Sequence, residues 1–198
     1  NFNALRNELL NNNQVSHVAR GGTYPGIESI TSMLFYAEGK QAIDNVDIQT
    51  AYTEDGYLET LGIEIIEGRG FDVDFKNDID ELVLNETAVS QLGYTNDNAV
   101  GKTIHYEFQN ATHSMEIIGV VKDYHFQSLH QKIKPLALSV APLFTGPTSY
   151  LIANVKSSDY FELITLFQNA WSKINPASPF EYSFLDDDFQ RNYKKEER

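Results

Sequence analysis

The order of strand and helix signals constrains this chain more than any single motif does. Both ends read as strand, helix and strand, whereas the segment between them is dominated by strand signals. The clearest element is a helix over residues 159–174, because Asp159 with Glu162 forms a capping-box-like start and the apolar residues share one face. That face consists of Tyr160, Leu163, Ile164, Phe167, Trp171 and Ile174. Residues 150–155 predict a strand before this helix, and residues 180–185 predict a strand after it.

The N-terminal third predicts a comparable succession of elements. Apolar side chains at helical spacing open the chain, and alternation of apolar and polar residues follows further on. The expected elements are, in order, an amphipathic helix over residues 1–13, a strand over 15–19, an irregular stretch over 21–45, a half-exposed strand over 46–52, a short helix from Asp55 to Gly62 and a strand over 63–67.

The middle of the chain is richer in strand signals. Residues 82–84 favour a strand that ends at Asn85, and Asn85 can cap a helix over 86–92 that stops at Gly93. Further on, two strand candidates over 103–108 and 115–122 bracket residues 109–113, which indicates a long hairpin. Three prolines, Pro135, Pro142 and Pro147, interrupt regular structure where the chain leaves this region.

These patterns predict a mixed α/β protein of the α+β class with two lobes. A discontinuous α/β lobe would be formed by residues 1–70 together with residues 148–198, and a smaller β-rich lobe over residues 71–147 would be inserted into it. The chain is long enough for this arrangement, because 198 residues can bury one large core or two small ones.

Charge and cysteine content exclude several classes of partner and site. The formal net charge of −13 would repel phosphate backbones, so we expect no nucleic-acid partner. Residues 44–86 hold 13 Asp and Glu against only Arg69 and Lys76, which indicates a solvated acidic face or a surface for a cation or a partner. The chain has no cysteine, which removes disulfides, thiolate nucleophiles and cysteine-based zinc sites.

One block of sequence is more specific than the rest. Residues 116–135 read as a buried strand that runs into a polar turn beginning at Asp123, and Gly119 interrupts the strand in the manner of a bulge or a close backbone approach. Three companion segments precede this block, namely Gly68-Arg69-Gly70-Phe71, Leu82-Val83-Leu84-Asn85-Glu86-Thr87-Ala88 and Gly101-Lys102-Thr103-Ile104. In this order and spacing, the four segments resemble the extracytoplasmic (periplasmic core) domain of MacB-type, FtsX-like ABC transporter permeases, most strongly over about residues 55–140.

The resemblance implies a position between two transmembrane helices at the extracytoplasmic face of the inner membrane, with a porter-like α/β lobe built from both chain ends. It also implies a non-catalytic, mechanical role, in which ATP-driven motion is relayed to export or extract a substrate. The implied partners are an ABC ATPase, a second permease copy and an adaptor or outer-membrane protein. We then expect both termini to emerge on one side and the excised domain to be largely monomeric. A free-standing periplasmic module that binds a peptide or glycan is the alternative, and a secreted hydrolase is a third, weaker one.

Two metal patterns are incomplete. Four histidines, His105, His113, His125 and His130, lie in one stretch, but the spacing of His125 and His130 fits neither a helical pair nor a same-face strand pair. The acidic run from Asp72 to Asp80 resembles a calcium loop, yet its fifth, sixth and twelfth positions are Lys76, Asn77 and Val83. We therefore expect no metal site and no stoichiometric zinc or calcium.

Patterns of nucleotide binding and catalysis are incomplete as well. Gly68-Arg69-Gly70 and Gly101-Lys102-Thr103 each lack most of a phosphate-binding loop. No nucleophile elbow frames a serine beside Asp123, His125 and Ser128, and nothing fixes the separation of Glu64 and Glu67 for glycoside hydrolysis. We expect Asp123 to bond turn amides and Arg69 to form a structural ion pair rather than to bind a ligand. The sequence thus predicts no catalytic, cofactor-binding or metal-binding residue and no enzyme activity.

Overall fold

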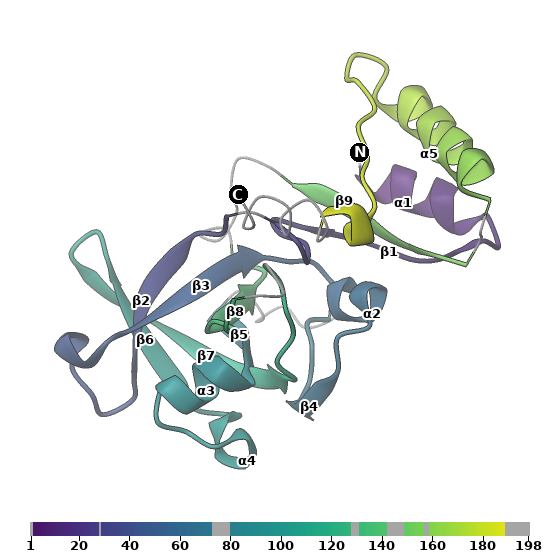
Figure 1. The fold of residues 1–198 in the computed structure, drawn as a ribbon. Coiled ribbons are helices and arrows are strands. Elements are labelled where there is room, and N and C mark those ends of the chain that lie inside the picture. Colours follow the sequence, from purple (N-terminus) through teal and green to yellow (C-terminus); the bar gives the residue numbers. More distant parts are fainter. Residues whose placement is uncertain are drawn as a thin grey trace, which may run out of the picture.

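The strands form two sheets, one of which unites the two ends of the chain (Figure 1). The computed structural model describes residues 2–27, 29–72, 80–127, 131–141, 149–156 and 159–188. We call residues 2–21 and 149–188 the terminal unit and residues 32–141 the central unit. The fold is a mixed α/β arrangement, as the sequence predicts.

The terminal unit pairs strand β1 with strand β9 and covers one face of this small sheet with two helices. Its elements are α1 (Phe2–Leu10), β1 (Val15–Gly21), β9 (Tyr150–Val155) and α5 (Tyr160–Ile174). The antiparallel pairing runs from Val15 opposite Val155 to Gly21 opposite Tyr150. Leu5 and Leu9 of α1 are buried in a cluster that includes side chains of α5 and β9, so helix amphipathicity builds this core.

The central unit is a seven-stranded sheet in the order β4-β7-β5-β8-β3-β2-β6. Strand β6 also pairs with β7, so every strand of the sheet except β4 is part of a closed ring. The elements are β2 (Ser32–Ala37), a 3₁₀ turn η1 (Ala42–Asp44), β3 (Val46–Tyr52), β4 (Ile65–Gly68), β5 (Glu81–Asn85), α3 (Glu86–Gln91), α4 (Asn96–Ala99), β6 (Thr103–Phe108), β7 (Ala111–Val121) and β8 (Leu136–Ser139). The short helix α2 (Tyr57–Leu61) lies beside the terminal unit.

Pairing in the central unit mixes both directions. Strand β3 is parallel to β8, and β5 is parallel to β7, whereas the other neighbours are antiparallel. A core of fully buried side chains lies along these strands, including Phe35, Ile48, Leu82 and Ile104. Closing the ring leaves few strand edges exposed, which removes a common route to unwanted pairing.

Most sequence-predicted elements are confirmed, with shifted ends. The helix over 159–174 begins at Tyr160 because the Asp159 carboxylate caps it by accepting a hydrogen bond from the Glu162 amide, 3.0 Å away. The predicted hairpin over 103–122 is present, but its turn is tighter than expected. Only Gln109 and Asn110 separate the strands, and both have positive φ, the left-handed conformation that two-residue hairpin turns require.

Four local predictions were wrong. Residues 21–45 are not irregular throughout, because they contain β2, and Leu136–Ser139 form β8 where the prolines suggested only an exit. Gly56, not Asp55, precedes α2 as its N-cap, and no side-chain bond caps this helix. Residues 180–184 carry no strand pairing, and a helical turn begins at Leu185.

Strand pairing also bears on the predicted lobes, whose boundaries at residues 70 and 148 stay a prediction. The segment from β2 to β4, which that division assigns to the terminal lobe, is hydrogen-bonded into the same sheet as β5 to β8. In contrast, β1 and β9 pair only with each other within named strands. The sheets therefore favour a boundary near residue 21 rather than residue 70.

Glycine makes the contact between β4 and β7 possible. A Cβ on Gly119 would overlap the carbonyl oxygen of Arg69, and a Cβ on Gly68 would overlap that of Ile118. Gly68 also has a positive φ of 72°. The register of β7 shifts here against β5, so Gly119 marks both the bulge and the close approach that its position in the sequence suggests.

Candidate functional site

The two units meet where β1 ends beside the end of β3. Gly21 forms an isolated antiparallel bridge with Thr53, and the Gly22 amide donates to the Tyr52 carbonyl at 2.7 Å. The Glu54 amide in turn donates to the Arg20 carbonyl at 3.0 Å. These bonds continue the backbone of the terminal sheet into the central sheet, and we call this region the junction.

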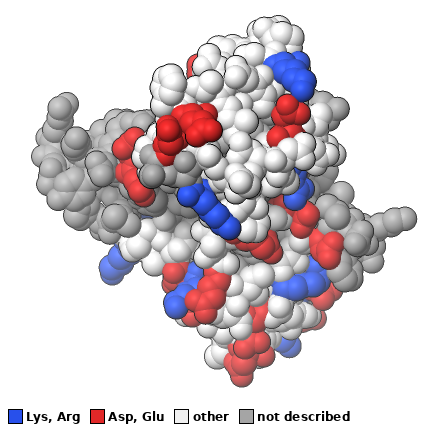
Figure 2. All heavy atoms as spheres, turned by 90° about the vertical axis from the view of Figure 1, so that its right-hand side faces the viewer, with Lys and Arg blue, Asp and Glu red and all other residues white. Residues whose placement is uncertain are grey.

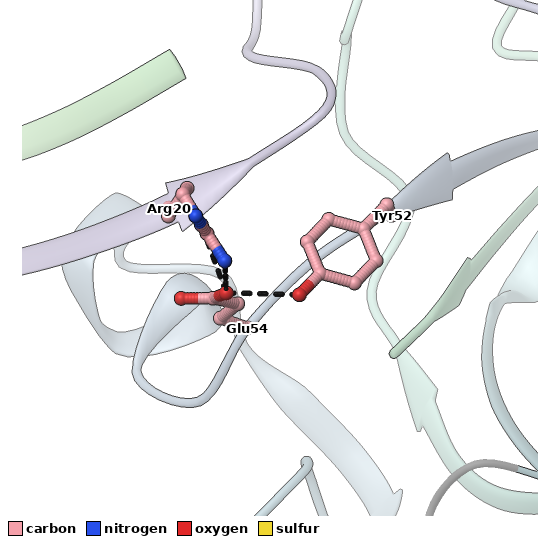
Figure 3. Close-up of polar contacts among 3 residues, drawn as sticks. All are labelled: Arg20, Tyr52 and Glu54. Carbon is pink, nitrogen blue, oxygen red and sulfur yellow. Dashed lines mark hydrogen bonds and ion pairs between the residues drawn. The ribbon is translucent and has the colours of Figure 1, made fainter. Parts of the chain in front are cut away.

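Three side chains form a polar cluster at the junction (Figure 3). Arg20 Nε donates to Glu54 Oε1 at 2.8 Å, and the Arg20 Nη2 atom forms an ion pair with the same oxygen. The Tyr52 hydroxyl donates to Glu54 Oε1 as well, at 2.8 Å. One carboxylate oxygen of Glu54 therefore links a residue of β1 with a residue of β3.

The contacts of this cluster shift the pKa values of two of its members. The hydrogen bond with Glu54 raises the pKa of Arg20, while burial of Tyr52 and its bond with the Glu54 carboxylate raise the pKa of the Tyr52 hydroxyl. The Arg20 guanidinium also lies over the Phe2 ring of α1, 5.2 Å from its centroid. The arginine thus joins α1, β1 and the central unit.

Helix α2 packs against the junction through Tyr57. Its ring is almost fully buried, and its hydroxyl donates to the Thr23 carbonyl at 3.1 Å. Gly21 lies against this ring so closely that an added Cβ would come within 2.7 Å of it. On the other strand, Asn154 of β9 donates its side-chain amide to the Thr60 carbonyl at 3.2 Å. Both strands of the terminal sheet therefore rest on α2.

The junction was not among the residues singled out in the sequence. The one local signal is Gly21-Gly22 after Arg20, where a charged residue precedes two small ones at a strand end. Pairing between Arg20 and Glu54 depends on the spatial meeting of β1 and β3, which no local pattern encodes. Figure 2 shows the side of the molecule that lies to the right in Figure 1, where acidic and basic side chains are interspersed over the described atoms.

The histidines do not converge on a metal site in the described part of the chain. His105 on β6 shares a hydrogen bond of 2.8 Å with Ser114, and His113 on β7 stacks on Tyr106 with ring centroids 5.1 Å apart. His125 follows β7, and His130 lies outside the described residues. Across these described residues, no group of three or more His, Cys, Asp or Glu could hold a metal ion.

The structure tests the prediction for Arg69 but not the prediction for the acidic loop. Most of the run from Asp72 to Asp80 lies outside the described residues, so the calcium-loop comparison stays a sequence argument. Arg69 Nη2 forms an ion pair of 2.8 Å with the Glu81 carboxylate at the start of β5, which confirms the predicted ion pair. Glu64, which the sequence analysis weighed with Glu67, forms an ion pair of 3.3 Å with Lys122.

Asp123 bonds the amide and the hydroxyl of Thr87 at the start of helix α3, whereas its turn position predicted bonds to turn amides. Its carboxylate accepts from the Thr87 amide at 3.0 Å and from the Thr87 hydroxyl at 2.6 Å. Ser128, the third member of the conceivable triad, lies outside the described residues. The Gly101-Lys102-Thr103 segment leads into β6 rather than into a helix, which differs from a phosphate-binding loop.

The side chain of Asn85 makes several hydrogen bonds at the point where β5 meets α3. Its side-chain oxygen accepts from the Ala88 amide at 3.0 Å, which confirms the predicted helix cap, and from the Leu136 amide at 2.9 Å. Its side-chain nitrogen donates to the Lys134 carbonyl at 2.9 Å. This fully buried amide therefore fixes α3 and β8 to the end of β5.

Solved structures share this fold. The periplasmic region of MacB from Actinobacillus actinomycetemcomitans is similar over 95% of this chain and 80% of its own, with 15% identity and a TM-score of 0.64. A domain of a putative permease protein from Porphyromonas gingivalis is similar over 87% of this chain and 68% of its own, with 16% identity and a TM-score of 0.59. The extracellular domain of the noncanonic ABC-type transporter YknZ from Gram-positive bacteria is similar over 88% and 81%, with 14% identity and a TM-score of 0.56.

Fold and sequence together define the class, a mixed α/β domain in which segments near the two described ends of the chain build one unit. The family model of the MacB-like periplasmic core domain matches residues 4–162, and the chain belongs to this family. A search of curated proteins finds no match. Within the described residues, no helix is both long and apolar enough to cross a membrane.

Proposed function

We propose that this chain is the extracytoplasmic domain of an ABC transporter permease that relays ATP-driven motion to export or extract a substrate at the cell envelope. The observation that carries the proposal is membership of the MacB-like periplasmic core domain family over residues 4–162. ATP hydrolysis would belong to a separate ATPase subunit or domain, and we expect no catalytic activity in this chain.

The architecture supports a relay in three respects. Both described ends of the chain, Phe2 and Asp188, belong to the terminal unit, so membrane helices joined to them would act on one body. The junction connects the units through an isolated β-bridge and its neighbouring hydrogen bonds, so one unit can turn against the other there. The central unit is a closed ring of strands with a buried core, which favours movement as a rigid body.

Partners and location follow from the same proposal. The domain would work at the periplasmic face of the inner membrane, as part of an integral membrane protein that pairs with a second permease copy. The ATPase would act through the membrane region, and an adaptor or outer-membrane protein would bind on the outside. Asn1 and Arg198 lie outside the described residues, so the expectation that both termini share one face stays a prediction.

A cross-link between the units in the full-length transporter tests the relay. The chain has no cysteine, so Asn154→Cys with Thr60→Cys would place a single disulfide across the junction. We expect substrate transport to fall at least about tenfold while ATP hydrolysis continues, and a reductant to restore transport. The control is His105→Cys with Ser114→Cys, a cross-strand pair inside the central unit.

The control cross-link should leave transport unchanged. Full transport with the junction locked would show that the two units move as one body, which contradicts a relay through the junction. Loss of transport in both cross-linked proteins would show that oxidation itself is harmful. A free-standing binding module would act without any ATPase, so normal function of the chain in cells that lack ABC ATPase activity would overturn the permease assignment.

A further inference from the structure

Two buried threonines at the junction have no hydrogen-bond partner for their hydroxyls. Thr23 lies two residues after β1 and is 2% exposed, and Thr53 directly follows β3 and is 1% exposed. Among the described residues, neither Thr23 Oγ1 nor Thr53 Oγ1 forms a hydrogen bond. Native proteins satisfy nearly all buried polar groups, because a hydroxyl that gives up water without gaining another partner is costly. These two hydroxyls therefore disfavour the arrangement in which they are buried.

Both threonines lie around the same buried ring. The Tyr57 hydroxyl donates to the Thr23 carbonyl at 3.1 Å, and the Tyr57 ring lies against Gly21, which is the bridge partner of Thr53. Tyr124 packs against the apolar cluster that contains Tyr57, and its buried hydroxyl also has no partner within the described chain. Unsatisfied hydroxyls are therefore concentrated where the end of β1 meets the end of β3.

The bonds that hold the junction together allow one unit to turn. The backbone connection is an isolated bridge with a few neighbouring hydrogen bonds. Arg20 and Tyr52 both donate to one oxygen, Glu54 Oε1 (Figure 3). Bonds to both carboxylate oxygens would fix the direction of the guanidinium, whereas bonds to a single oxygen let it rotate about that atom. The units can therefore turn without loss of this polar cluster.

We propose that the hydroxyls of Thr23 and Thr53 make the junction a two-state hinge. When the terminal unit turns against the central unit, water reaches these hydroxyls and supplies the missing hydrogen bonds, so the turned arrangement is close in free energy to the described one. The inference rests on the proposed function, in which the units move relative to each other, and it names the groups that set the balance. Removing the hydroxyls without changing the side-chain shape should favour the described arrangement.

Substitution by valine tests the hydroxyls in the 198-residue chain. Thr23→Val and Thr53→Val each remove an unsatisfied hydroxyl, so we expect each to raise the melting temperature by about 2 °C. The matched control is Thr60→Val, because Thr60 is 3% exposed and its hydroxyl donates to the Gly56 carbonyl at 2.7 Å. This control should lower the melting temperature by about 3 °C. An unchanged or lower melting temperature in the Thr23 and Thr53 variants would show that their hydroxyls are already bonded, which overturns the proposal.

Distances between the units test the turning itself. Gln91 on α3 and Asn169 on α5 are exposed, and cysteines at these positions can carry spin labels because the chain has no other cysteine. We expect two label separations in the otherwise unaltered chain, and a share of the turned separation that falls at least about fivefold when Thr23→Val and Thr53→Val are combined. One separation in both proteins, or equal shares in both, would overturn the proposal. Labels at Gln91 and the exposed Glu116, both in the central unit, should give one separation throughout.

These two measurements separate the hinge from the proposed function, because neither needs an ATPase or a membrane. In the full-length transporter, the combined valine variant should transport substrate more slowly at unchanged ATP hydrolysis. A hinge in the isolated chain together with unaltered transport in this variant would contradict the relay and leave the hinge in place. A single arrangement in the isolated chain would overturn the hinge and leave the family assignment in place.

Discussion

The two units achieve order by different means. The central unit closes its sheet into a ring and buries large side chains such as Phe35, Ile48 and Leu82 completely. The terminal unit has two paired strands, and much of the apolar surface of α5 stays partly exposed. The terminal unit, which would be joined to the moving membrane helices, therefore buries less apolar surface than the central unit. Local unfolding should begin in the terminal unit.

The largest expected effect comes from breaking the central unit at Gly119. Gly119→Ala places a Cβ against the Arg69 carbonyl, and both atoms belong to paired or adjoining backbone that cannot easily move. We expect a loss of about 4 kcal/mol in the free energy of unfolding, measured by denaturant titration. The matched control is Gly22→Ala, whose Cβ would meet nothing closer than 3.6 Å, and it should change stability by less than about 1 kcal/mol. Similar losses in the two variants would contradict this account of the β4–β7 contact.

The second largest expected effect is a loss of stability in the terminal unit alone. Leu9→Ala removes a side chain that is 1% exposed in the terminal core, and should cost about 3 kcal/mol. Leu10→Ala, its neighbour at 38% exposure, should cost less than about 0.5 kcal/mol. Hydrogen exchange of the Leu9 variant should show faster opening of β1 and β9 alone. Faster exchange of β2 to β4 as well would favour the sequence-predicted boundary at residue 70 over the boundary near residue 21.

A third comparison sets one helix cap in each unit against the other. Asn85→Ala removes three hydrogen bonds from a fully buried position, whereas Asp159→Ala removes the capping bond from the Glu162 amide at the exposed start of α5. We expect losses of about 3 kcal/mol and about 1 kcal/mol, respectively, in thermal or denaturant unfolding. Equal losses would mean that Asn85 acts only as a cap and does not hold β8.

The last effect is absent at neutral pH and appears only at alkaline pH, where it comes from tyrosines with buried hydroxyls. Burial raises the pKa of Tyr57 and of Tyr124 above the ordinary value near 10. Each therefore contributes stability that is fully present below about pH 10 and is lost as the pH rises above it, by about 1.4 kcal/mol per pH unit for each tyrosine. Tyr124→Phe should reduce this slope, with little cost at pH 8, because no described group bonds its buried hydroxyl. An unchanged slope in this variant would show that Tyr124 is not a source of the pH dependence.

Sequence reasoning succeeded where a local pattern sets the structure. The amphipathic face of α5, the Asn85 cap and the glycine close approach at Gly119 each follow from a few neighbouring residues. It failed where a strand is defined by its partner. Residues 136–139 form β8 only because β3 and β5 lie on either side, and residues 180–184 have strand alternation without a partner. The junction cluster was missed for the same reason, since Arg20 and Glu54 meet through the fold.

The pairing of β1 with β9 also sets the order in which the chain can mature. Residues 15–21 are made early, yet in the described chain their ladder partner is residues 150–155, so this sheet cannot form until the whole central unit has been made. The ring of strands over residues 32–139 has no such dependence and can close while the rest is still being synthesised or threaded across a membrane. Bringing distant segments together is the slow step in folding, because loop closure costs entropy before any contact repays it. The helix of residues 2–10 would therefore lack its packing partner α5 until residues 160–174 have been made, in need of protection from aggregation during that interval.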